Sequence, residues 1–398
     1  MKGRLIGHLS ATLTLLMLTA SVPYAQQSQP PAGLRVVWEK TYGNDRLSTE
    51  FRAIAAAGNG EALVGVSERD TLDAATAKAT RLLLWRIDST GRLAGETEIK
   101  PPASVKSANT AVIRDVIALA AGEAMLLVDF EAGHPSLVRV DAMGKQVATR
   151  EVTEASRALT LFKIVPGTGG SFLLIGHESL DALAIQIDAT IKTTWEKKQD
   201  RGRMDFLVDG LPASNNGYVL VGNSGQYDPL RVGPSIVWVA QYDANGVPKS
   251  EITFPGRYGR IARTRDGGYV IVYDKSASNA QEIQIKALSA DLKELSETPL
   301  VSPGASFSDY KISATPAGSF VVAGGKDGKP YVATVDAGGR LTGTLADSTG
   351  QTPGQSVDIG SYGLAYDSPA SIFVASSNIE VRDQNNIKQK VRIRKLAM

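Results

Sequence analysis

The sequence contains no cysteine among its 398 residues. Disulfide bonds and thiolate metal ligands are therefore excluded, and the folded chain must be held together by the burial of apolar side chains. Histidine is almost as rare, with three residues, of which only His134 and His177 lie beyond the N-terminal segment. Two histidines without a third, suitably spaced ligand are a weak metal signal, and we favour loop histidines that are hydrogen-bonded to the backbone.

The sequence also lacks an excess of one charge. It has 43 basic and 41 acidic residues, and loss of Lys2 and Arg4 with an N-terminal signal would leave 41 of each. A balanced chain argues against nucleic acid as the main partner. The basic residues of the one basic run, KQKVRIRK, occupy alternate positions, at Lys388, Lys390, Arg392 and Arg394. This period of two predicts a strand with a solvated basic face, which we favour over an anion site.

Long apolar runs are missing except near the N-terminus. Two basic residues precede an apolar stretch at residues 9–20, and small residues follow it, which is the layout of a secretory signal. We predict a signal peptide over residues 1–25, cleaved after Ala25 or alternatively near Ala20, and a flexible Gln/Pro-rich linker over residues 26–33. A buried N-terminal helix is the less favoured interpretation. No stretch is long enough to span a membrane, so we predict a periplasmic or secreted protein.

What the sequence has instead is a repeat. A turn rich in small and polar residues, followed by a nearly unbroken apolar run, occurs seven times, at residues 58–66, 121–128, 167–176, 215–222, 266–272, 317–324 and 368–375. Each copy follows another short apolar segment, which predicts seven β-hairpins. Because the runs lack polar alternation, the strand after each turn is expected to be buried on both faces.

A second marker follows the hairpins, in the form Asp-x-x-Gly. It begins at Asp88, Asp141, Asp243 and Asp336, with degraded versions at Asp188 and Ser289. Successive copies are 53, 47, 55, 46 and 47 residues apart, which is the length of one four-stranded propeller blade. Aspartate at the start of such a motif accepts hydrogen bonds from backbone amides, so we favour a turn over a calcium site.

The two markers together predict an all-β fold, a β-propeller of seven four-stranded blades over residues 34–398. Each blade is expected to run from strand A through a tight turn to B, then a longer loop to C, and the Asp-x-x-Gly turn to D. Residues 36–43 then form a strand D, and residues 385–398 form a last strand C. The N-terminal strand is expected to pair in the last blade and close the ring, which removes an open edge. The sequence predicts the number of blades to within one, because the 53- and 55-residue intervals contain insertions.

The ends of the D strands carry a further motif, Trp-x-Lys-x-Tyr-Gly. It occurs at residues 36–43, its core recurs at 193–200, and a looser copy lies at 252–259. In the looser copy, Phe254 and Tyr258 keep the spacing of Trp38 and Tyr42. With the Asp-Gly-Gly-Tyr-Val-Ile stretch at 266–271, this motif resembles secreted bacterial β-propeller repeat proteins. The resemblance implies the fold and leaves the ligand open, because it lies in structural residues. Eight-bladed quinone-dependent dehydrogenases are less similar, since their regular tryptophan docking motif and adjacent cysteines are missing.

The longer connections must lie together at one end of the predicted ring, around the mouth of its channel. We call this end the long-loop face; it comprises residues 67–80, 222–235, 274–281, 325–330 and 379–386 between strands B and C, and 42–50, 196–204 and 254–259 between D and A. We predict a ligand site here, formed by Arg69, Asp70, Tyr227, Arg231, Arg257, Tyr258, Asp274, Lys326 and Asp327. Tyrosine and arginine combine contact surface with directed hydrogen bonds. For any single residue, an ordinary solvated loop residue is the favoured alternative.

Catalytic motifs are scarce: the sequence has no Gly-x-Ser-x-Gly elbow, no His-Glu-x-x-His and no phosphate-binding glycine loop. We therefore predict a non-catalytic, monomeric scaffold without a cofactor or metal, which binds a protein or cell-envelope component; an inhibitor or immunity protein is one version. The alternative is a lyase or hydrolase that acts on a sugar or ester at the channel mouth, and it requires inward-facing polar side chains with shifted pKa values. A purely structural role in an envelope assembly requires an exposed apolar patch.

Overall fold

The computed structural model describes residues 34–398 except 45, 71–79, 106–109, 153–156, 215, 226–234, 276–280, 301–306, 328, 346–355, 369–370 and 384–385. For strand residues 80, 307–308, 356–361, 378–383 and 386–388 it describes the backbone alone. Helix is limited in these residues to one short 3-10 turn, η1 (Ala120–Gly122). No helix among them has the length and apolar character needed to cross a membrane.

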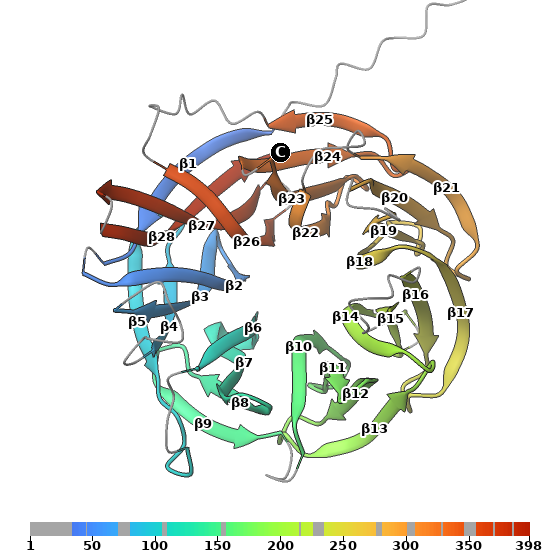
Figure 1. Cartoon of the computed structure of the whole chain (residues 1–398), viewed down its shortest axis with the longest axis horizontal. Coiled ribbons are helices and arrows are strands. Elements are labelled where there is room, and N and C mark those ends of the chain that lie inside the picture. Colours follow the sequence, from blue (N-terminus) through green and yellow to red (C-terminus); the bar gives the residue numbers. More distant parts are fainter. Residues whose placement is uncertain are drawn as a thin grey trace, which may run out of the picture. The chain divides into compact units, whose positions relative to one another are not determined.

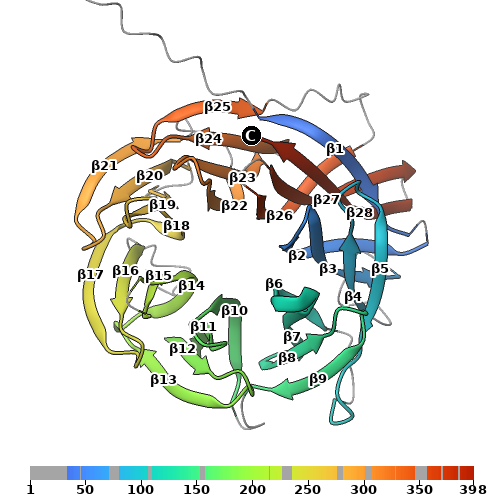
Figure 2. The same ribbon diagram turned by 180° about the vertical axis from the view of Figure 1, so that it is seen from behind.

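The described strands form seven four-stranded antiparallel sheets that are arranged as a ring (Figures 1 and 2). Blade 1 contains β2 (Ser48–Gly58), β3 (Glu61–Arg69), β4 (Thr80–Ile87) and β5 (Leu93–Ile99). Blade 2 contains β6 (Val112–Ala118), β7 (Ala124–Glu131), β8 (His134–Val140) and β9 (Gln146–Glu151). Blade 3 contains β10 (Leu159–Pro166), β11 (Phe172–Glu178), β12 (Asp181–Ile187) and β13 (Thr193–Gln199).

The remaining blades repeat the same order, with the first strand innermost (Figure 1). Blade 4 contains β14 (Met204–Pro212), β15 (Tyr218–Gly225), β16 (Ile236–Tyr242) and β17 (Pro248–Pro255). Blade 5 contains β18 (Arg257–Arg263), β19 (Tyr269–Asp274), β20 (Ile283–Leu288) and β21 (Glu294–Pro299). Blade 6 contains β22 (Phe307–Ala314), β23 (Phe320–Lys326), β24 (Lys329–Val335) and β25 (Leu341–Leu345).

Blade 7 is built from both ends of the described chain, in the order β26 (Ser356–Ser368), β27 (Ser371–Asp383), β28 (Asn386–Ala397) and β1 (Arg35–Tyr42). Strand β1 is antiparallel to β28, with Glu39 opposite Arg394 and Tyr42 opposite Val391. The predicted seven-bladed fold and its closure by the N-terminal strand are therefore confirmed, and so are the seven predicted B strands.

The core lies between neighbouring sheets. On β15, for example, Leu220 packs toward blade 3 with Ile175, while Val221 packs toward blade 5 with Ile271. All three of these aliphatic types gain free energy by leaving water, at roughly 25 cal/mol per Å² of apolar surface. Burial of both faces of the B strands explains why their sequences show no polar alternation.

The Asp-x-x-Gly segments are turns between strands C and D, as predicted. Asp88 Oδ1 accepts hydrogen bonds from the backbone amides of Thr90 and Arg92, both at 2.9 Å. Gly91 has a φ of +76°, a left-handed conformation that favours glycine. The same pair of aspartate-to-amide bonds recurs at Asp141, Asp188, Asp243 and Asp336.

The D-strand tryptophans dock on these turns in the next blade. Trp38 Nε1 on β1 donates to the carbonyl oxygen of Ser89 at 3.0 Å, and its ring lies where a Cβ at Gly91 would come within 3.0 Å. Trp195 on β13 donates in the same way to Ala244, at 2.9 Å, and packs on Gly246. The tryptophan and the turn glycine are therefore two halves of one contact between adjacent blades.

The looser copy of the motif, at residues 252–259, is not at the equivalent position of its blade. The prediction that it matches the copies around Trp38 and Trp195 was therefore wrong. Trp195 pairs with Gln186, and the corresponding position in blade 4 is Ser250, which pairs with Gln241. Phe254 lies further along β17, and Tyr258 already belongs to β18 in blade 5. The spacing of two aromatic residues alone did not fix the register of a strand.

Two residues of the basic run on β28, Arg392 and Arg394, do not form the predicted solvated face; the side chain of Lys388 lies outside the described residues. Arg394 is 5% exposed, and its Nε donates to Glu39 Oε2 on β1. Arg392 Nε lies 3.7 Å from Glu39 Oε1. Because β1 lies beside β28, its glutamate compensates two guanidinium groups that the alternating pattern had placed in solvent.

Candidate functional site in the central channel

The innermost strand of every blade contains a β-bulge or a comparable irregularity. The pairing register shifts, for example, between Phe51 and Ala53 on β2 and between Leu161 and Lys163 on β10; the other shifts lie in β6, β14, β18, β22 and β26. A bulge interrupts the alternation of side chains along a strand. Adjacent residues such as Phe162 and Lys163 can therefore both line the channel.

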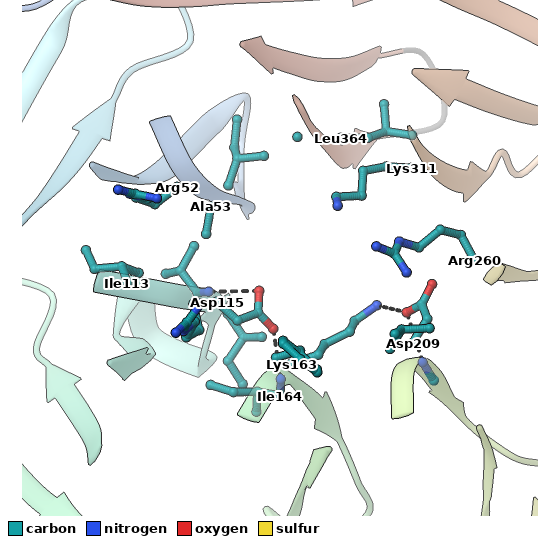
Figure 3. Close-up of a pocket in the computed structure, with 18 of the residues that line it drawn as sticks. Arg52, Ala53, Ile113, Asp115, Lys163, Ile164, Asp209, Arg260, Lys311 and Leu364 are labelled. Carbon is teal, nitrogen blue, oxygen red and sulfur yellow. Dashed lines mark hydrogen bonds and ion pairs between the residues drawn. The ribbon is translucent and has the colours of Figure 1, made fainter. Parts of the chain in front are cut away.

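These strands surround a cavity of about 600 Å³. This volume is within the usual range of small-molecule pockets, about 300–1,000 Å³. Charged side chains form a belt on its wall: Arg52, Arg114, Lys163, Arg260 and Lys311 are basic, and Asp115, Asp209 and Asp309 are acidic. Figure 3 shows Arg52 on one side of the cavity, with Arg260 and Lys311 on the other.

The three aspartates connect neighbouring blades. Asp115 Oδ2 accepts a hydrogen bond from the backbone amide of Ile164 at 2.8 Å. Asp209 Oδ2 accepts one from Ile261 at 3.0 Å, and Asp309 Oδ2 accepts one from Tyr362 at 2.8 Å. Each aspartate thus satisfies an amide near the irregularity of the next inner strand, so it contributes to the packing of the ring.

Equivalent aspartates have different electrostatic surroundings. Asp209 forms an ion pair with Lys163. Burial alone would raise the pKa of Asp209, but the charges of Lys163 and Arg260 outweigh it and hold the pKa below its ordinary value. At Asp115, burial is the larger effect and raises the pKa to about 6, although Lys163 opposes it. Proximity to Asp209 adds to the rise.

Arg260 and Lys311 both point into the cavity, where Lys163 also extends toward Asp209 (Figure 3). Arg260 Nη1 donates to the carbonyl oxygen of Gly259 at 3.1 Å, and no ion pair between described residues includes its guanidinium. Lys311 Nζ lies 2.8 Å from Asp309 Oδ1. Burial and the nearby charge of Arg260 lower the pKa of Lys311. Two positive charges thus face one part of a sheltered cavity, where an anion would stabilise both.

An aromatic cluster lies on the wall formed by blades 3 and 4. The ring centres of Phe162 and Phe206 are 6.4 Å apart, and each ring also contacts His177, at 5.7 and 6.4 Å. Both phenylalanines line the cavity. His177 Nδ1 is 3.0 Å from the carbonyl oxygen of Ser179, which confirms the backbone-bonded histidine expected at this position. Across the described residues, no three His, Asp or Glu side chains form a group suited to a metal ion.

Three of the predicted site residues are brought together in blade 5. Arg257 Nε donates to Asp274 Oδ2 at 2.9 Å, and the Arg257 guanidinium lies 5.5 Å from the ring centre of Tyr258. Asp274 is fully buried, whereas Tyr258 is 48% exposed and has a left-handed φ of +58°. Asp274 therefore positions Arg257, and Tyr258 is the member of this group with the most accessible ring.

The other predicted residues lie elsewhere. Arg69 ends β3 in blade 1, with its Nη1 4.0 Å from Glu50 Oε2, and Asp70 follows it. In blade 6, Lys326 Nζ lies 5.6 Å from the ring centre of Tyr331, and Asp327 has a φ of +53°. Tyr227 and Arg231 lie outside the described residues. A ligand site on the long-loop face stays a prediction.

Sequence reasoning missed the channel residues because it treated each A strand only as a short apolar segment. A signal was present: one or two charged residues interrupt these segments in "VIRDVI" (112–117), "LFKIV" (161–165) and "FLVDG" (206–210). If the sequences of successive blades are aligned on the turns after these segments, the charged residues occupy similar positions along the innermost strands. A charge inside an otherwise apolar strand requires a partner or a water-filled cavity.

The fold and cavity define this chain as a seven-bladed β-propeller with a charged central channel. No family model matches the chain, and no curated protein matches it. Among solved structures, it is similar to a protein of unknown function from Dyadobacter fermentans DSM 18053, with 9% identity, a TM-score of 0.54, and coverage of 92% of this chain and 100% of the other.

Two further solved structures resemble it. One is the polysaccharide lyase Uly1, with 10% identity, a TM-score of 0.58, and coverage of 91% of this chain and 99% of the lyase. The other is Drosophila Plexin A in complex with Semaphorin 1b, with 9% identity, a TM-score of 0.51, and coverage of 90% and 87%. At such identities the likeness shows the fold alone.

Proposed function

We propose that this protein is an exported, non-catalytic binding propeller of the periplasm or cell exterior. In this proposal it binds an anionic group of a protein or cell-envelope component in its central channel, which the ligand reaches from the long-loop face. The observation that carries the proposal is the convergence of Arg260 and Lys311 on a cavity of about 600 Å³.

The two cations are better suited to a bound anion than to the packing of the ring. Lys311 already pairs with Asp309, whereas no ion pair between described residues includes the Arg260 guanidinium. A partly buried cation outside an ion pair is costly, because it has lost water without gaining a full compensating charge. The lowered pKa of Lys311 reflects that cost, since burial and Arg260 both disfavour its charged form. An anion between the two side chains would accept charge-assisted hydrogen bonds from both.

The alternative function, a lyase or hydrolase for a sugar or ester, requires inward-facing polar side chains with shifted pKa values, and the channel has these at Asp115, Asp209 and Lys311. The candidate proton donor or acceptor among them is Asp115, whose pKa is raised. A general acid or base must have an oxygen free to reach the substrate. Asp115 Oδ1 accepts from the amide of Val116 at 2.9 Å, and Oδ2 accepts from Ile164. Both oxygens are therefore engaged by the backbone, which supports binding over proton transfer.

Substitution of the two cations tests the proposal. We expect citrate, inorganic phosphate or D-glucuronate, titrated calorimetrically at constant ionic strength, to bind the wild-type protein. Arg260→Gln or Lys311→Met should weaken binding by about 10- to 100-fold, because each removes charge-assisted hydrogen bonds of about 1.5–3 kcal/mol. The exposed Arg340 and Lys293 provide the matched controls Arg340→Gln and Lys293→Met, which should bind normally. Equal affinities in all four variants would refute a channel site.

A further inference from the structure

We infer that the ligand of this channel carries its anionic group on a sugar ring, that is, an acidic sugar or a chain of them. This inference rests on the proposed function and adds the chemical class of the ligand. It comes from the wall of the cavity formed by blades 3 and 4, which differs from the cationic wall formed by blades 5 and 6.

The wall of blades 3 and 4 offers an aromatic surface. Phe162 and Phe206 meet nearly edge to face, at an interplanar angle of 66°, and both line the cavity. His177 contacts both rings, and its own orientation is held by the Ser179 carbonyl. Partly exposed rings in a fixed cluster present an apolar surface at little entropic cost. The C–H face of a sugar ring packs well on such a surface.

A polar ion pair lies beside the aromatic surface. Lys163 and Asp209 belong to the same two blades and form an ion pair on the cavity wall. Both Asp209 oxygens already accept, from Lys163 and from the amides of Gly210 and Ile261, whereas the Lys163 ammonium has further N–H donors for hydroxyl groups. A ligand with an apolar ring and no hydroxyls would remove water from this pair without replacing its hydrogen bonds. The wall therefore favours a hydroxylated ring over an aromatic acid.

The order of the blades places the two features in one site. Blades 3 and 4, with the aromatic cluster and the ion pair, are followed around the ring by blades 5 and 6, with Arg260 and Lys311 (Figure 1). A ring packed on Phe162 and Phe206 would thus direct a carboxylate toward the two cations. A single cavity of about 600 Å³ contains all of these side chains.

Four small probes separate the contributions of ring and charge. D-glucuronate has both the ring and the carboxylate, D-glucose lacks the carboxylate, D-gluconate lacks the closed ring, and benzoate has a ring without hydroxyls. Ligand-observed NMR titration of the full-length mature protein should show glucuronate binding at least tenfold more tightly than the other three. Phe162→Leu and Phe206→Leu should each weaken glucuronate by about 2- to 12-fold, the usual strength of an aromatic contact, and leave gluconate unchanged.

The outcomes distinguish this inference from the proposed function. Gluconate that binds as tightly as glucuronate, with both affinities lowered by Arg260→Gln, would overturn the sugar-ring inference and leave the anion site intact. A preference for benzoate would replace the sugar by an aromatic acid. Loss of glucuronate binding in Tyr258→Leu, with normal binding in Phe162→Leu, would move the site to the long-loop face. Indifference to Arg260→Gln would overturn the proposed function itself.

Discussion

Deletion of strand β1 (Arg35–Tyr42) is expected to abolish cooperative folding of the propeller. This strand supplies the outer edge of blade 7 and pairs with β28 along its whole length. It also carries contacts to blade 1, because Trp38 Nε1 donates to Ser89 and the Tyr42 hydroxyl donates to the carbonyl oxygen of Gly91 at 2.7 Å. Without β1 the ring would be open between its first and last blades.

The expected loss is comparable with the stability of an ordinary domain. Removal of the half-buried Trp38 side chain should cost less than about 3–5 kcal/mol, the range for truncation of a fully buried aromatic residue. Loss of Glu39 also removes the ion pair with Arg394, which is worth about 1.5–3 kcal/mol as a charge-assisted hydrogen bond. The exposed edge of β28 adds a tendency to aggregate. Typical stabilities are about 5–15 kcal/mol, so little or no folded population should remain.

Urea unfolding of a chain that begins at Leu34, compared with one that begins at Asn44, measures this effect. The first should show one cooperative transition, and the second should show none. A synthetic peptide of residues 34–43 should restore the transition by adding the missing strand. Trp195→Ala is the matched control for Trp38→Ala: it removes the same kind of contact within a continuous chain, so it should lower stability but keep cooperativity. Identical transitions for the two truncated chains would contradict the role of β1.

The sequence allowed the architecture to be predicted because propeller signals are local. A glycine turn, a buried B strand and an Asp-x-x-Gly turn each arise from a few neighbouring residues, and their repetition sets the number of blades. Ring closure followed from the strand D residues around Trp38, at the start of the repeat. The incorrect register of Phe254 and Tyr258 shows the limit of this approach. These two residues were matched by aromatic spacing alone, whereas the position of Trp195 is fixed by the turn that precedes its strand.

The channel site was beyond such reasoning because it depends on irregular geometry. The register shift beside Lys163 breaks the period-two pattern from which strand faces are predicted. Its partner Asp209 is 46 residues away, on the next blade. The contact of Arg257 with Asp274 lies within the predicted set, since both residues flank the same hairpin. Contacts between residues on different blades could be predicted only with the three-dimensional arrangement of the closed ring.

The channel aspartates provide the second large prediction, which compares Asp209→Asn with Asp115→Asn. Asp209→Asn should destabilise the protein by about 1.5–3 kcal/mol at pH 7.5, because it removes the charged partner of Lys163, whose side chain is 35% exposed. Asp115→Asn should cost less than about 1 kcal/mol. Its amide oxygen can still accept from Ile164, and the substitution removes a charge that burial disfavours.

The pH dependence of the two variants should differ in sign. The pKa of Asp115 is about 6 in the folded protein and about 3.8 in the unfolded chain, so its proton stabilises the fold below about pH 4, and this contribution is lost as pH rises through 6. Relative to wild type, Asp115→Asn should therefore become more favourable between pH 4 and 7. The pKa of Asp209 is lowered in the folded protein, so its contribution is complete above about pH 4 and is lost as the pH falls further.

Urea unfolding of wild type and both variants at pH 3.5, 5 and 7.5 distinguishes these expectations. The cost of Asp209→Asn should be constant from pH 7.5 to 5 and shrink at pH 3.5, whereas that of Asp115→Asn should rise steadily toward low pH. Both aspartates accept a hydrogen bond from an amide of the next blade, and the asparagine oxygen can keep that bond in either variant, so the two costs differ by the effect of the charge. Equal costs at every pH would show that the bonds between blades outweigh the charge of the belt. If the two variants differ in stability only near neutral pH, where both aspartates are ionised in the wild-type protein, Lys163 stabilises the charge of Asp209 more than that of Asp115.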